Sequence, residues 1–294
     1  MRTRPMISSQ RGLDQASLFA RDLFGDPSPR RTRKAWEAEP WEAEDQETVQ
    51  GFDNRIQVHA RPTNPSTLLF PFNTICHIVR TNGGRGSGTL IAPRVVLTAG
   101  HVLQGATGAT VTPGFNATAP AADQRPANPG SQTVTSTALR LHSSLDIGLV
   151  LLPARFTRPS RFMMLQPRGD INTATLLTIA GYPRVQPPGG QVTVAGTMWR
   201  HSDKLRITNV TPTHLTYPID TDRGQSGSPL WLLGNDEIRL LLGVHIQGGA
   251  VNNTGVRITC AVIDWIESEC RAASITTLPI VDQVQRRRVC AGAA

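Results

Sequence analysis

Residues 220–229 read Asp-Thr-Asp-Arg-Gly-Gln-Ser-Gly-Ser-Pro, and the interpretation of the whole chain starts from this stretch. Gly224 and Gly227 carry no Cβ, so the backbone can bend tightly enough to present the hydroxyl of Ser226. In such a turn the amides of Gly224 and Ser226 can point to one spot, as the two donors of an oxyanion hole must. A serine between glycines also occurs in ordinary turns, so the motif needs support from elsewhere in the chain.

Two upstream segments supply the partners that a serine nucleophile requires. Residues 87–102 predict a strand, a turn and a second strand that leads to His101, and histidine is the usual base near neutral pH. Asp146 stands at the head of an apolar run, where a carboxylate is costly unless another group satisfies it. Asp146 can hold the His101 imidazole in one tautomer and stabilise its protonated form. The order His101, Asp146, Ser226 is that of chymotrypsin rather than that of subtilisin or the α/β-hydrolases.

The chain resembles the trypsin-fold serine peptidases, and more narrowly their glutamyl-endopeptidase, or V8 protease-like, branch. The resemblance covers residues 53–270, and its matching pieces are residues 98–101, 146–149, 224–229 and 243–249, with 53–58 similar to the start of the mature enzyme. It implies an all-β fold of two six-stranded antiparallel β-barrels with a C-terminal helix. It also implies a catalytic triad of His101, Asp146 and Ser226 in the cleft between the barrels, with the amides of Gly224 and Ser226 as the oxyanion hole.

The same resemblance assigns residues to substrate binding. His245 matches the histidine that helps glutamyl endopeptidases bind an acidic side chain, Thr221 matches their threonine, and Gly248 lies in the same motif as His245. These matches predict cleavage after Glu, with Asp tolerated less well. Asp220 argues the other way, because counting back from Ser226 it falls where trypsin keeps the aspartate that selects Arg or Lys. A peptidase that cleaves after Arg or Lys, and a catalytically silent binding module on the same fold, therefore stay open as alternatives.

The resemblance also has departures that concern activation. Gln225 stands where many members outside this branch have an aspartate that pairs with a freed N-terminus, and an amide cannot form that ion pair. Residues 1–52 carry a basic cluster followed by an acidic one and few apolar residues, which is typical of a solvated, mobile segment or a propeptide. Cleavage between Glu47 and Asp53 would free an α-amino group, which in the resembling branch sits near the specificity pocket.

Composition and charge limit the other classes of function. The chain has 294 residues, 30 Lys and Arg against 22 Asp and Glu, and a formal net charge of +8. No run of arginines is interleaved with aromatic residues, so we expect no nucleic-acid partner. The resemblance implies polypeptide substrates, and we expect a monomer. No Cys or His spacing suggests zinc, and the mechanism requires no metal or organic cofactor.

Targeting signals are harder to interpret. No stretch approaches the roughly 20 apolar residues that span a bilayer, so we expect no membrane insertion. Residues 1–34 are basic but lack the apolar region of a Sec signal peptide. The resemblance implies a secreted protein, and an intracellular location stays open.

The remaining pattern is one of short β-rich runs separated by turn residues, which predicts barrel one over about 53–155 and barrel two over about 165–271. Residues 257–271 place apolar side chains on one face and predict the C-terminal helix. Residues 272–294 are expected to form a solvated tail. Five histidines lack a motif and are expected to be structural: His59, His77, His142, His201 and His214.

Four cysteines allow three disulfide pairings. Val102 replaces the cysteine that often follows the catalytic histidine in trypsin-like enzymes, so the usual histidine-loop disulfide is absent. Cys260 and Cys270 can pair across the last helix, and free buried thiols are the alternative. The other two cysteines are Cys76 and Cys290.

Overall fold

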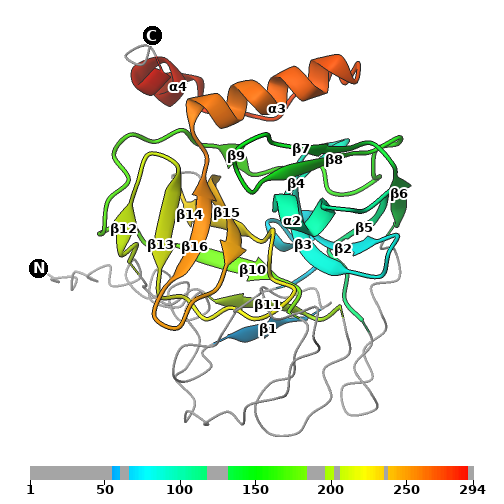
Figure 1. Ribbon diagram of the computed structural model, residues 1–294, viewed down its shortest axis with the longest axis horizontal. Coiled ribbons are helices and arrows are strands. Elements are labelled where there is room, and N and C mark those ends of the chain that lie inside the picture. The colour runs from blue at the N-terminus through cyan, green and yellow to red at the C-terminus, as the bar shows by residue number, and fades with distance from the viewer. Residues whose placement is uncertain are drawn as a thin grey trace, which may run out of the picture.

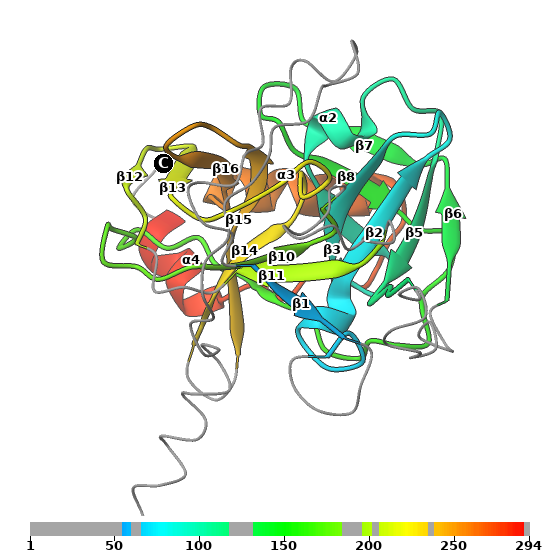
Figure 2. The same ribbon diagram turned by 90° about the horizontal axis from the view of Figure 1, so that it is seen from below.

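The computed structural model describes residues 55–59, 66–117, 132–183, 196–201, 206–234 and 238–290. These residues form two antiparallel β-sheets that lie beside each other, with the helices α3 (Cys260–Ala272) and α4 (Gln283–Cys290) along one side of the pair (Figure 1). The predicted leader, residues 1–52, and the predicted mature N-terminus at Asp53 lie outside the described residues. The all-β fold class is confirmed, and Figure 2 shows the same two sheets from below.

The first sheet contains seven strands among the described residues, in the order β6-β5-β2-β3-β4-β8-β7. Its members are β2 (Ile75–Arg80), β3 (Arg85–Ala92), β4 (Val95–Thr98), β5 (Ala109–Pro113), β6 (Val134–Ser136), β7 (Leu139–Leu141) and β8 (Gly148–Leu151). The two edge strands, β6 and β7, are neighbours in the chain and form two halves of one run over residues 134–141. One half pairs with β5 and the other with β8, so this run joins both edges of the sheet and closes it as a barrel of six runs.

In the part of the chain that the structure describes, the second sheet has nine strands, in the order β1-β11-β10-β14-β15-β16-β13-β12, with β9 parallel to β15. They are β1 (Ile56–Val58), β9 (Met164–Leu165), β10 (Thr178–Gly181), β11 (Met198–His201), β12 (Asn209–Val210), β13 (His214–Tyr217), β14 (Pro229–Leu233), β15 (Arg239–Gln247) and β16 (Asn253–Arg257). β11 pairs with β10 and β12 pairs with β13, at opposite ends of the sheet. If β11 and β12 are counted as one run, and β1 and β9 are set aside, six barrel runs are again recognisable. The extra strands are β1 and β9, which come from segments that enter and cross to this barrel.

Strand β16 was not predicted, and the helix after it begins later than predicted. The run Asn-Thr-Gly-Val-Arg has little apolar alternation, yet it pairs with both β13 and β15. Gly255 permits this close packing, because a Cβ there would lie 2.4 Å from Leu230 Cδ1. Helix α3 then begins at Cys260, where the side chain of Thr259 accepts a hydrogen bond from the Val262 amide at 3.3 Å.

The predicted apolar face of the helix packs into the core. Val262, Ile263 and Ile266 have no exposed surface, and they belong to one apolar cluster with the first barrel. A second cluster fills the other barrel. Short 3-10 helix η2 (Phe72–Thr74) and helix α2 (Gly100–Leu103) flank strands β2 and β4. Among the described residues, no helix combines the length and apolarity needed to cross a membrane.

The expectation of a solvated C-terminal tail is wrong. Ile275 and Val281 are buried, and Leu165 of β9 exchanges backbone hydrogen bonds with residues 280 and 282. The guanidinium of Arg286 contacts Asp264 and Glu267 of α3, both at 2.6 Å. The polar composition of the tail concealed these contacts, because only a few apolar side chains anchor it.

The disulfide is also different from the suggested one. Cys260 is bonded to Cys290, which ties α4 to the first turn of α3. Cys270 and Cys76 are free and buried, so the alternative of buried thiols holds for these two. Burial raises the pKa of the Cys270 thiol to about 11, mainly by desolvation, and raises that of Cys76 further. Both thiols are therefore protonated at neutral pH and poorly reactive.

Cys290→Ser should lower the free energy of unfolding by about 2–4 kcal/mol, because the disulfide closes a loop of moderate length in the unfolded chain. Urea unfolding of the two proteins in oxidising buffer measures the difference. Dithiothreitol is the control, since it should reduce the stability of the wild type to that of the variant. Equal unfolding midpoints in oxidising buffer would show that the disulfide contributes nothing.

Candidate active site

The first element of the site joins His101 and Asp146. Strands β4 and β8 pair antiparallel with Thr98 opposite Gly148, so the residues after β4 and before β8 emerge at the same end of the barrel. His101 lies on α2, and its Nδ1 is 2.7 Å from Asp146 Oδ2. The backbone amide of His101 also donates to Asp146 Oδ1 at 2.8 Å. The carboxylate is thus held by two contacts to one residue, which fixes the plane of the imidazole.

Local packing makes this contact possible. A Cβ at Gly100 would lie 2.9 Å from Asp146 Oδ1, so a side chain there would displace the carboxylate. The bend before β8 is shaped by His142, whose Nδ1 accepts hydrogen bonds from the amides of Ser144 and Leu145 at 3.2 Å. The ring of His142 packs edge-on against Trp265 of α3, 5.0 Å between centroids. His142 is structural, as predicted, and it positions the loop that carries Asp146.

The pKa of Asp146 lies below its ordinary value of 3.8. Burial acts to raise it, but the hydrogen bond and charge of His101 and the amides of His101 and Gly100 together outweigh burial. Asp146 is therefore ionised at neutral pH and can stabilise a protonated imidazole.

The second element is the loop that carries Ser226. Gly224 and Gly227 have φ angles of +91° and +86°, the region that the sequence predicts for them. The loop is closed by hydrogen bonds from the Gln225 amide to Asp222 O and from the Gly227 amide to His245 O. Gly227 cannot be replaced without a rearrangement, because a Cβ there would lie 2.0 Å from the carbonyl oxygen of Ser87.

Ser87 of β3 brings the two elements together. Its amide donates to Ser226 O at 2.8 Å, and its hydroxyl donates to Gly224 O at 2.8 Å. The neighbouring Gly86 fits between Val102, the residue after His101, and Ser226, since a Cβ there would lie 2.7 Å from Val102 Cγ1 and 3.3 Å from Ser226 O. The structure therefore places the Ser226 loop against the first barrel beside α2, where the sequence expects the cleft between barrels.

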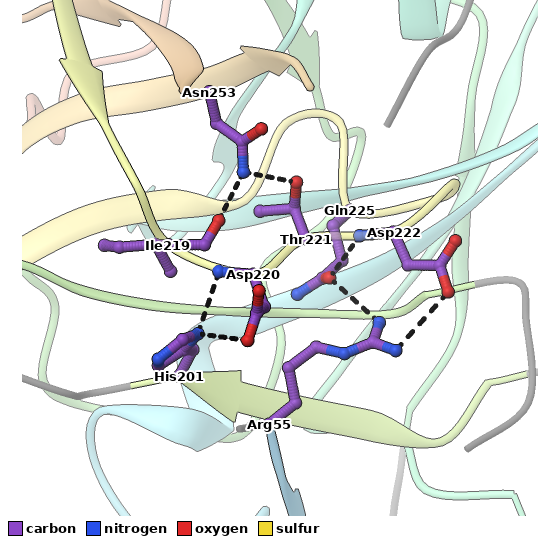
Figure 3. A network of polar contacts seen from close by, with 8 residues as sticks. All are labelled: Arg55, His201, Ile219, Asp220, Thr221, Asp222, Gln225 and Asn253. Atoms are coloured by element: carbon purple, nitrogen blue, oxygen red, sulfur yellow. Dashed lines mark hydrogen bonds and ion pairs between the residues drawn. The ribbon is translucent and has the colours of Figure 1, made fainter. Parts of the chain in front are cut away.

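A buried polar network surrounds the same loop (Figure 3). Asn253 of β16 donates to the carbonyl of Ile219 and to Thr221 Oγ1, the latter at 2.8 Å, and its Oδ1 accepts from the Gly249 amide at 3.0 Å. Asn253 thus links Thr221 to Gly249. Thr221 is a predicted substrate-binding position, and Gly249 follows another, Gly248. This asparagine was not singled out from the sequence, because its motif-free strand was not recognised.

Asp220 lies at the opposite end of the network, beside His201 of β11 (Figure 3). The Asp220 amide donates to His201 Nδ1 at 2.9 Å, and the Asp220 Oδ2 lies 3.7 Å from the same nitrogen. Because the Asp220 amide donates to it, His201 Nδ1 carries no proton in this geometry and acts as an acceptor. The longer contact to Oδ2 is not an ion pair in that tautomer. Both side chains are almost fully buried, and the Asp220 carboxylate is turned toward β11.

His245 lies on β15, which pairs antiparallel with β14, the strand that follows the Ser226 loop. Its Nδ1 is 2.6 Å from the hydroxyl of Tyr217, and its backbone exchanges hydrogen bonds with Gly227 and Ser228. His245 and Thr221 have no exposed surface. The sequence singled out His245 for substrate binding but not Tyr217, its partner on β13.

A further contact reaches the loop from the start of the described chain. The guanidinium of Arg55 lies 3.4 Å from Asp222 Oδ2 and 3.5 Å from Gln225 Oε1 (Figure 3). The sequence offers no signal that would pair residues this far apart. Among the described residues, no group of three or more His, Cys, Asp or Glu side chains is placed to hold a metal ion.

Comparisons with known proteins bear on this arrangement. Residues 86–238 match the model of the trypsin-like peptidase domain. A glutamyl endopeptidase of Bacillus licheniformis is 30% identical over 269 residues, which cover 85% of this chain and 78% of the relative.

The chain belongs to the trypsin-like peptidase family. This trypsin-like peptidase is a hydrolase, a serine endopeptidase, and its substrates are polypeptides. A solved structure of a Glu endopeptidase has the same fold, with a TM-score of 0.59 and 24% identity. The match covers 75% of this chain and 98% of the chain of that structure. An extracellular metalloprotease of Bacillus subtilis is 38% identical over only 72 residues, 24% of this chain and 22% of that protein.

The depressed pKa of Asp146 predicts a pH-dependent contribution to the stability of the peptidase. A group whose pKa is lower in the folded state stabilises the fold above its unfolded pKa and loses that contribution as the pH falls through the folded pKa. Wild type should therefore exceed Asp146→Asn in free energy of unfolding at pH 7, and the difference should shrink below the ordinary value of 3.8. Urea unfolding between pH 7 and pH 3 measures it. A difference that is independent of pH would mean that the charge of Asp146 does not stabilise the fold.

Proposed function

We propose that this trypsin-like peptidase cleaves through a triad of Ser226, His101 and Asp146. The observation that carries the proposal is the double contact between His101 and Asp146 at one end of the first barrel. Ser87 holds the Ser226 loop against the same barrel. This geometry combines an oriented base with a glycine-flanked serine, which is the arrangement of activated serine nucleophiles.

In the proposed mechanism Ser226 Oγ attacks the carbonyl carbon of the scissile peptide bond, and its proton passes to His101 Nε2. The amides of Gly224 and Ser226 stabilise the oxyanion that forms. The imidazolium then gives the proton to the leaving amine as the C–N bond breaks and an acyl-enzyme remains. Water, activated by His101, hydrolyses that ester and restores Ser226. Asp146 stays ionised throughout and keeps the imidazole in the productive tautomer.

Ser226→Ala should reduce peptide cleavage by more than about a thousand-fold, and His101→Ala should do nearly the same damage, because the triad acts as one unit. Peptidase kinetics and labelling with a fluorophosphonate measure both effects. Ser160→Ala, which changes an exposed serine in the segment between the barrels, is the matched control and should label and cleave like wild type. Near-native turnover in either triad variant would refute the assignment, and a wild type without labelling would favour a silent binding module.

For the specificity we propose cleavage after Glu, with Asp as a poorer substrate. The Bacillus licheniformis relative is a glutamyl endopeptidase, which supports this choice. The contacts of His245 and Thr221 support it as well. If the Tyr217 hydroxyl donates to Nδ1 of His245, the proton of the neutral ring lies on Nε2, which can donate to a substrate carboxylate. Asn253 holds the hydroxyl of Thr221 in one place by donating to it.

The position of Asp220 favours Glu over Arg or Lys. A substrate carboxylate next to an ionised Asp220 would be repelled by about 4 kcal/mol at an effective dielectric near 20. The Asp220 carboxylate points toward His201, which reduces its repulsion of a substrate carboxylate. Since His245 and Thr221 are covered in this structure, the pocket has to open when a substrate side chain enters.

A panel of peptides that differ only in the residue before the scissile bond tests the specificity. Wild type should prefer Glu, and Tyr217→Phe should reduce kcat/KM for the Glu peptide by about tenfold, because one hydrogen bond to the proposed carboxylate-binding ring is lost. Its effect on the corresponding Gln peptide should be smaller. Preference for Arg or Lys that disappears in Asp220→Ser would overturn the glutamyl proposal and leave the peptidase intact.

We further propose that residues 1–52 are a propeptide and that the mature enzyme is extracellular and monomeric. The Cys260–Cys290 disulfide supports the location, because structural disulfides persist mainly in oxidising compartments. Intact-mass measurement and N-terminal sequencing of the natively produced protein test the processing and the disulfide together. A major species that retains residues 1–52 would contradict the propeptide.

A further inference from the structure

Arg55 is a buried cation next to the proposed oxyanion loop. The exposed fraction of its side chain is 2%, and that of its partner Asp222 is also 2%. A buried carboxylate or guanidinium is costly without a partner, so neither charge would be expected here without the other. The two residues are 167 positions apart in the chain, which means that folding has to bring the charge to the loop from another element.

The contacts of Arg55 reach both ends of the turn that contains Gly224. One guanidinium nitrogen lies 3.4 Å from Asp222 Oδ2 and another 3.5 Å from Gln225 Oε1. The same Gln225 oxygen accepts from the Asp222 amide at 2.8 Å, and Asp222 Oδ1 accepts from the Arg223 amide at 2.8 Å. The guanidinium therefore closes a ring of polar contacts around residues 222–225 (Figure 3).

Strand β1 delivers Arg55 to this position. It pairs antiparallel with β11, with Ile56 opposite Arg200 and Gln57 opposite Trp199. The guanidinium carbon of Arg55 lies 6.0 Å from the centroid of the Trp199 ring. Because β1 follows directly after Arg55, the pairing fixes the backbone from which the guanidinium reaches the loop.

We propose that Arg55 is a positioning residue that holds Asp222 and Gln225, and through them the Gly224 amide, in the geometry that stabilises the oxyanion. Because this cation belongs to a side chain, the loop does not depend on a freed α-amino group. Gln225, which cannot form an ion pair with such a group, is therefore compatible with activity. This inference rests on the proposed catalytic role of the Gly224 and Ser226 amides. It concerns a residue that contacts neither the substrate nor the reacting atoms.

The test compares Arg55→Gln with wild type in peptidase kinetics and in affinity for a peptide boronate, which binds Ser226 as a tetrahedral adduct. A shift of the oxyanion donors by about 1 Å can cost about a hundred-fold in rate, so we expect kcat to fall by about that factor. We expect KM to change less than threefold and boronate affinity to fall in parallel with kcat. Arg55→Lys should recover part of kcat, because it restores the charge but not the forked contact to two residues.

Arg286→Gln is the matched control, because it also removes a guanidinium paired with carboxylates, but on α3 and α4. It should lower thermal stability without lowering kcat. Asp222→Asn tests the same contact from the other side and serves also if Arg55→Gln does not fold. Its loss of kcat should resemble that of Arg55→Gln, and the double variant should lose little more than either single one.

The outcomes separate the two proposals. If wild type cleaves peptides and binds the boronate but Arg55→Gln or Asp222→Asn keeps the kcat of Arg286→Gln, the role of Arg55 is refuted and the triad stands. A chain in which a short uncleavable extension replaces residues 1–52 lacks both the proposed propeptide and a free α-amino group at Asp53. If this chain loses kcat while Arg55 is intact, the internal-cation proposal is also refuted. If wild type neither cleaves nor binds the boronate, the proposed function itself fails.

Discussion

The hydrogen bonds of Ser87, through its side chain and its backbone, hold the two barrels in the relative position that the site requires. Ser87 binds the Ser226 carbonyl through its amide and Gly224 O through its hydroxyl, while the same hydroxyl accepts from the Tyr182 amide and the Ser87 carbonyl accepts from Thr98. These groups are buried, so each would be costly if its partner moved away. The residue before Ser87 has no side chain, which leaves room for the chain that carries the nucleophile. The geometry of the site thus depends on β3 as much as on the loop itself.

Much of the fold was predictable because local patterns and the tertiary structure agree. The run at β4 and the apolar face of α3 carry period-matched signals, and the structure forms both elements, with α3 beginning at Cys260 rather than at residue 257. The antiparallel pairing of β4 with β8 also explains why residues near His101 and Asp146 can be recognised from sequence, since each follows or precedes a strongly apolar strand. Whether these residues form a working triad is a question for the kinetic experiments.

What could not be predicted lies where the decisive contact is distant or where burial is sparse. Arg55 and Asp222 are separated by most of the chain, and an ion pair leaves no periodic trace in either segment. Asn253 lies on a strand whose letters resemble a turn, and its side chain becomes informative only when Thr221 and Gly249 are seen beside it. Residues 272–290 are polar overall, and two buried apolar side chains with a disulfide are enough to attach them.

The attached C-terminal segment changes where the folded unit ends. Backbone groups of residues 280 and 282 cap the edge that Leu165 presents on β9, and Val281 fills the space beside it. A chain shortened to the length suggested by family resemblance, ending near Arg271, would uncover that edge together with apolar surface around Ile275. Open strand edges next to apolar surface recruit other chains, so shortening would endanger solubility before it endangered the catalytic geometry.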